Sequence, residues 1–162
     1  MQQAKQKREL KITTNSDLDI QIESIVNVPR EYVFLAHTDP KAIPHWWGPA
    51  KYTTTVMEMD VRPGGRWRFV QKDSEGNEYV FFGEFKEIVP LDKIIWTFNY
   101  EPFPNSECLE TVQFIALDGN RTKILVNSIY SSKEARDGML SSGMEAGYSA
   151  SLDRLEKMEF PL

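Results

Sequence analysis

Two adjacent tryptophans, Trp46 and Trp47, are the side chains best suited to hold a small apolar molecule. They follow Pro44 closely and precede Gly48 and Pro49, so the backbone that carries them is stiff. Tryptophan combines a large apolar area with one N–H donor, and binding and orienting such a molecule requires both. Two interpretations are open: the rings seal one end of the core, or at least one of them lines a ligand entrance.

Groups suited to acid–base or nucleophilic catalysis are few. The histidines are His37 and His45, which we interpret as packing or surface residues. Cys108 has no cationic neighbour in the sequence, so we expect an inert thiol, and Glu84 would be a general base only on a bulged strand. The sequence contains no zinc-type Cys/His spacing, no P-loop, no GxSxG motif and no GxGxxG motif opening a helix. These patterns predict no catalytic residue, no metal and no cofactor.

The composition is that of one folded domain. With 162 residues, 41% hydrophobic and 12% aromatic, the chain is long enough for one core and too apolar to be disordered. A formal net charge of -5 does not favour binding to nucleic acid. The single cysteine cannot form an internal disulfide, and neither a signal peptide nor a membrane-spanning run is recognisable. We expect a cytoplasmic protein without membrane insertion, with residues 1–9 as a flexible leader and 10–162 as a single domain.

Hydrophobic alternation predicts an antiparallel sheet. Apolar residues alternate from Leu18 to Val26, and two short helices are expected next, one after Pro29 and one ahead of Gly48. Six further strands, separated by turn sequences such as PGG and LDGN, are predicted over residues 51–61, 65–72, 78–89, 93–100, 107–117 and 122–130. Short turns join antiparallel neighbours, so the pattern predicts a seven-stranded antiparallel sheet.

The hairpin that turns at residues 62–64 has a favoured register. It places Met59 opposite Trp67 and Met57 opposite Phe69 on one face, with acidic residues opposite arginines on the other. The aromatic residues predicted for the concave face are Trp67, Phe69, Tyr79, Phe81, Phe85, Trp96, Phe98 and Tyr100.

One long C-terminal helix is predicted over residues 133–158. Its apolar stripe consists of Leu140, Met144, Tyr148, Leu152 and Leu155. Gly143 and Gly147 each cost about 1 kcal/mol of helix propensity relative to alanine. Two explanations remain open: the helix approaches the sheet closely there, or the missing side chains leave room for a ligand. The Tyr148 hydroxyl would then orient the bound molecule, unless it is bonded within the core.

Four segments resemble successive blocks of one family: VPREYVFLAHTDPKAIPHWWGP, MEMDVRPGGRWRFV, FFGEFKEIVPLDKIIWTF and GMEAGYSASLDRLEKM. Over about residues 10–160 the chain is similar to the family related to the activator of heat-shock-protein-90 ATPase, within the START-like (SRPBCC) superfamily. The resemblance implies an α+β helix-grip fold. In that fold a curved seven-stranded antiparallel sheet wraps around a long C-terminal helix, and two short helices follow strand 1. It also implies an apolar pocket between sheet and helix.

The leading functional hypothesis is binding of a small hydrophobic ligand in that pocket. Members of the superfamily bind lipids, polyketides and hormones, and some catalyse reactions in the same place. The residues predicted to bind the ligand are Trp46, Trp47, Trp67, Phe69, Tyr79, Phe81, Trp96, Phe98, Met144, Gly147 and Tyr148. Two alternatives stay open. One is a chaperone-associated or stress-response domain acting through a protein partner, and the other is an enzyme of cyclase or hydrolase type. We expect a monomer or homodimer.

Overall fold

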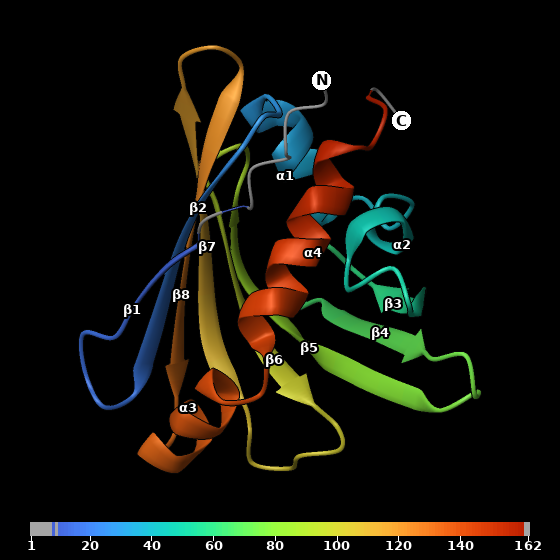
Figure 1. Ribbon diagram of the computed structural model, residues 1–162, viewed down its shortest axis with the longest axis vertical. Helices are drawn as coiled ribbons and strands as arrows, with labels where there is room; N and C mark the ends of the chain where they lie inside the picture. Colours follow the sequence, from blue (N-terminus) through green and yellow to red (C-terminus); the bar gives the residue numbers. More distant parts are fainter. Residues whose placement is uncertain (1–7, 9, 161–162) are drawn as a thin grey trace, which may run out of the picture.

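The computed structural model describes residue 8 and residues 10–160 (Figure 1). Its elements are β1 (Lys11–Thr13), β2 (Asp19–Val26), α1 (Arg30–Thr38), α2 (Ile43–Trp46), β3 (Thr53–Met59), β4 (Arg66–Lys72), β5 (Glu78–Val89), β6 (Lys93–Tyr100), β7 (Cys108–Leu117), β8 (Arg121–Tyr130), α3 (Lys133–Leu140) and α4 (Met144–Glu156). Most of the predicted leader, residues 1–9, lies outside the described residues. Arg8 is described, and its guanidinium bonds to Asp153 and pairs with Glu156 on α4.

The strands form one antiparallel sheet in the order β1-β2-β8-β7-β6-β5-β4-β3. The prediction of an α+β chain with an antiparallel sheet and a C-terminal helix is confirmed. The strand number is corrected, because the described residues contain eight strands rather than seven. The additional strand is β1, whose three residues are too few to show an alternating pattern and which pairs only with β2.

Helix α4 lies across one face of the sheet, which we call the inner face (Figure 1). Helices α1 and α3 lie toward opposite ends of the molecule in the same view. The core is built from inward-facing residues of the strands together with the apolar sides of α1 and α4. Leu152 and Leu155 of α4 and Val33 of α1 are fully buried in it.

The predicted long C-terminal helix is in fact two helices. Helix α3 begins after Ser132, whose hydroxyl accepts a hydrogen bond from the Ala135 amide at 3.1 Å, and it ends at Leu140. Gly143, just before α4, has φ of +82°, in the left-handed region that favours glycine. The prediction of one helix is therefore wrong. The sequence did not reveal the break, because the apolar stripe continues across it from Leu140 to Met144.

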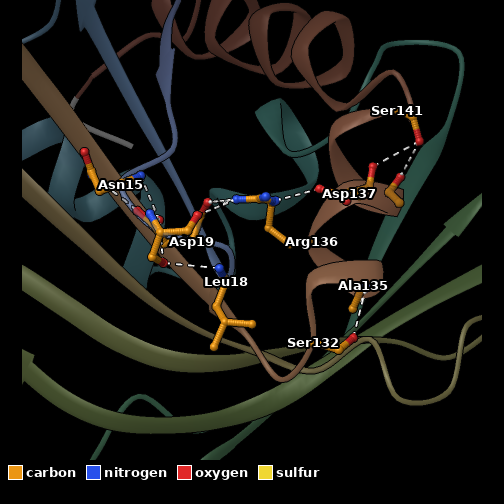
Figure 2. Close-up of polar contacts among 10 residues, drawn as sticks. Asn15, Leu18, Asp19, Ser132, Ala135, Arg136, Asp137 and Ser141 are labelled. Carbon is orange, nitrogen blue, oxygen red and sulfur yellow. Dashed lines mark hydrogen bonds and ion pairs between the residues drawn. The ribbon is translucent and has the colours of Figure 1, made fainter.

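Arg136 fixes α3 to the turn ahead of β2 (Figure 2). Its guanidinium donates to the Ser16 carbonyl at 2.7 Å and to the Asp19 carbonyl at 3.2 Å. Asp19 is 7% exposed, although alternation predicts that it points outward, because its carboxylate accepts the backbone N–H groups of Asn15 and Ser16. Burial alone would raise the pKa of Asp19, but these hydrogen bonds and those from the Ser16 and Asn15 side chains outweigh it and lower the pKa. The hydrogen bonds of Arg136 therefore hold α3, which directly precedes α4, against the start of β2.

The predicted register of the β3–β4 hairpin agrees with the structure near the turn and differs from it farther along the strands. Met59 pairs with Trp67, as predicted. A β-bulge then brings Val56 rather than Met57 opposite Phe69, and Met57 is left 62% exposed.

Candidate functional site

The inner face carries a network of aromatic rings from β4, β5 and β6. Trp67 and Trp96 are stacked with centroids 4.4 Å apart and are 1% and 6% exposed. The Trp67 indole donates to the Thr97 carbonyl at 3.1 Å. A Cβ at Gly83 would collide with that same carbonyl oxygen, so Gly83 lets β5 and β6 approach closely. These buried rings form the floor of the candidate site.

The two tryptophans of the Pro-rich segment have different surroundings. Trp46 is 3% exposed, and its indole donates to the Ala36 carbonyl of α1 at 2.8 Å. Trp47 is partly exposed and contacts Phe81 and Phe69 with centroids 4.9 and 5.2 Å apart. Of the pair, therefore, Trp46 seals the core and Trp47 joins the ring network.

Phe81 and Phe98, also predicted to bind a ligand, are partly exposed members of the network. Their centroids lie 5.8 Å apart, and Phe81 also stacks on Tyr100 at 4.8 Å. Tyr79 lies at the far end of β5, and its hydroxyl donates to Asp73 at 3.2 Å in the β4–β5 turn. Tyr79 is therefore tied to the hairpin rather than to α4.

Helix α4 contributes the remaining predicted residues. Met144 and Tyr148 are partly buried and lie against the core. Gly147 is partly buried, and a Cβ added to it would meet no atom within 4 Å. The explanation of Gly147 by close helix–sheet contact is therefore wrong, because the point where its Cβ would lie is open.

A buried carboxyl group, Glu110 on β7, lies beside the ring floor. Its Oε1 accepts the Trp96 indole N–H at 3.0 Å, and its Oε2 accepts the Ser128 hydroxyl at 3.0 Å. The residue as a whole is partly exposed, but its carboxyl group lies deep enough for burial to raise its pKa, and the two hydrogen bonds offset only part of this effect. The folded environment therefore favours the neutral form of Glu110 more than water does.

Sequence analysis missed Glu110, although one signal was available. In β7, Glu110 is in phase with the buried residues Cys108, Val112 and Phe114, so an acidic side chain stands at an inward position. Glu84, the base that we considered, has the opposite placement: its side chain is 44% exposed and pairs with Lys86.

The remaining titratable candidates are structural. His37 is buried between Trp46 and Phe114, and its Nδ1 lies 2.8 Å from the Val33 carbonyl. Burial lowers the pKa of His37 to about 4, so the ring is neutral at physiological pH. Burial also raises the pKa of the Cys108 thiol, which disfavours the reactive thiolate.

Within residues 8 and 10–160, no group of three His, Cys, Asp or Glu side chains is placed to hold a metal ion. No helix there is long and apolar enough to cross a membrane.

A C-terminal helix held against one antiparallel sheet defines the helix-grip class of α+β proteins. Residues 27–158 match the model of the activator of Hsp90 ATPase homolog 1-like proteins, and the chain belongs to that family. No curated protein matches the sequence.

Solved structures show the same fold. A protein from Rhodobacter sphaeroides is 23% identical, with a TM-score of 0.83 over 91% of this chain and 95% of that one. Protein Ms6760 from Mycobacterium smegmatis is 21% identical, with a TM-score of 0.80 over 91% and 95%. An AHSA1 protein from Silicibacter pomeroyi is 20% identical, with a TM-score of 0.66 over 85% and 94%.

Proposed function

We propose that this chain binds a small apolar molecule between the inner face of the sheet and α4. The observation that carries the proposal is a set of partly exposed rings at the inner face of the sheet: Trp47, Phe81, Phe98 and Tyr100. They contact one another and the buried floor, so they offer a continuous aromatic surface. A ligand that covers them removes apolar area from water, at about 25 cal/mol per Å².

The fold favours this function over the two alternatives. Proteins of this superfamily commonly hold hydrophobic ligands between the sheet and the C-terminal helix, and the partly exposed rings of this chain lie at the inner face of its sheet. On the sheet side, the ligand would contact Trp67, Phe69 and Trp96. On the side of α4, it would contact Met144, Gly147 and Tyr148. A cytoplasmic location and a monomeric or homodimeric state remain predictions.

Neighbouring phenylalanines on β5 provide a matched test. Phe81 points to the inner face, whereas Phe82 lies on the outer face, where the Arg68 guanidinium sits 5.8 Å from its ring. We expect Phe81→Ala to weaken binding of the neutral probe N-phenyl-1-naphthylamine at least about tenfold, because one ring's apolar contact is lost. Phe82→Ala should leave binding unchanged. Fluorescence titration measures both, and equal effects from the two substitutions would contradict the proposed site.

A second test asks whether the ligand occupies the space next to Gly147, and it removes no core side chain. Gly147→Leu places an isobutyl group in the open space beside α4, so probe binding should fall at least about tenfold if ligand occupies that space. The melting temperature should hold or rise, because leucine is about 1 kcal/mol better than glycine in a helix. Gly138→Leu is the control, since Gly138 of α3 also has no atom within 4 Å of an added Cβ and is exposed. A stable Gly147→Leu protein with unchanged probe affinity would remove this position from the site.

A further inference from the structure

Glu110 carries an inward-facing carboxyl group that solvent reaches from the inner face. Its neighbours on that face are Trp96 and Ser128 across the sheet and Cys108 and Val112 along β7. These four residues are only 2–6% exposed, whereas Glu110, in the same backbone setting, is partly exposed. The accessible area of Glu110 therefore belongs to its side chain, which hydrogen bonds hold toward the inner face.

The carboxyl group has no cationic partner among the described residues. Its two hydrogen bonds come from uncharged donors, the Trp96 indole and the Ser128 hydroxyl. None of the ion pairs within residues 8 and 10–160 includes Glu110. A carboxylate accepts about four hydrogen bonds, so both oxygens keep lone pairs for a further donor. A glutamine would accept the Trp96 N–H without the cost of enclosing a charge, so holding Trp96 does not by itself explain a carboxyl group here.

Glu110 lies next to the partly exposed rings of the proposed site. Strand β6 pairs with β7 so that Trp96 is opposite Glu110 and Phe98 is opposite Cys108. Phe98 and Glu110 are therefore diagonal neighbours on the inner face, a separation that aromatic and long side chains can bridge. The Phe98 ring centroid in turn lies 5.8 Å from that of Phe81. A molecule that lies on these two rings can place its polar end at Glu110.

We infer that the ligand is an apolar amine whose ammonium group pairs with Glu110. This inference rests on the proposed function and adds the chemical class of the molecule bound. An ammonium group has three N–H donors, which suit the unused lone pairs of the carboxylate. Aromatic faces attract cations, so the rings beside Glu110 favour the same charge. A carboxylate or phosphate end would instead meet the like charge of an ionised Glu110.

Competition among ten-carbon chains tests this preference. Decylammonium, 1-decanol and decanoate are each used to displace N-phenyl-1-naphthylamine at pH 7, in about 0.15 M salt to screen long-range attraction to the acidic chain. In the unsubstituted protein, decylammonium should bind at least about tenfold more tightly than decanoate. Glu110→Gln should lower the ratio of decylammonium affinity to decanol affinity at least about tenfold, which corresponds to about 1.4 kcal/mol. Its affinity for decanol should stay nearly the same, because glutamine leaves the rings in place.

Glu84→Gln is the matched control, because it removes the same charge from a side chain that is 44% exposed and pairs with Lys86. Its ratio of decylammonium to decanol affinity should equal that of the unsubstituted protein. An effect of net charge alone would appear in both variants. The comparison of decylammonium with decanoate needs no substitution, so the inference stays testable even if Glu110→Gln does not fold.

Three results would overturn the inference alone. Decanoate binding as tightly as decylammonium to the unsubstituted protein would mean that no cation is recognised. An unchanged ratio in Glu110→Gln would mean that the carboxyl group only holds Trp96 and Ser128. Equal losses of decanol and decylammonium affinity in that variant would mean that Glu110 acts as a neutral hydrogen-bonding group. In all three cases probe binding would keep the proposed function intact, whereas if neither the probe nor any chain binds, both fail.

Discussion

Replacing Trp67 with alanine is expected to lower the free energy of unfolding by about 3–5 kcal/mol. The ring is 1% exposed, stacks on Trp96 and donates to the Thr97 carbonyl, so its loss leaves a large cavity and an unbonded carbonyl oxygen. Urea denaturation measures the change. Trp47→Ala is the matched control and should cost less, because Trp47 is partly exposed. A loss below about 1 kcal/mol for Trp67→Ala would show that the inner face is assigned wrongly.

Glu110→Gln is expected to change how stability depends on pH. Because burial raises the pKa of Glu110 in the folded state, the unsubstituted protein keeps its full stability below the ordinary value of 4.5 and loses stability as pH rises through the raised pKa. Glutamine still accepts the Trp96 N–H and carries no charge, so its protein should not show this loss. The difference between the two should grow by about 1.4 kcal/mol for each unit by which the pKa is raised.

Urea denaturation from about pH 4 to pH 9 measures that difference across the titration of a raised carboxyl group. Glu84→Gln is the control, since Glu84 is 44% exposed and its pair with Lys86 lies at the surface, where such pairs are worth at most about 1 kcal/mol. A Glu110→Gln protein that is less stable by the same amount at every pH would mean that the carboxyl group acts only through its hydrogen bonds.

The sequence predicted best those features that follow from local alternation. The inward positions of Trp67, Phe69 and Trp96 are confirmed, because a strand's side chains alternate regardless of which strands lie beside it. The bulge at Met57 could not be foreseen, since Val56 and Met57 are adjacent apolar residues and either of them could face Phe69. The helix break at Gly143, which has a left-handed backbone conformation, could not be predicted either, because glycine also occurs inside helices.

The polar groups of the candidate site depend on contacts distant in sequence. Glu110 meets Ser128 because β7 pairs with β8, and it meets Trp96 because β6 lies on the other side. No local pattern connects these residues, so only the folded arrangement reveals that they are neighbours.

The position of β2 in the sheet affects the order in which the chain can fold during synthesis. Each strand from β4 to β8 pairs with the strand made just before it, so this part of the sheet can grow as the chain emerges. Strand β2 instead pairs with β8, joining Val26 to Thr122. Its apolar residues Ile20 and Ile22 thus lack their main partner until the last strand has been made. The nascent chain is therefore most prone to aggregate just before β8 leaves the ribosome, and closing this distant pair sets a slow final step.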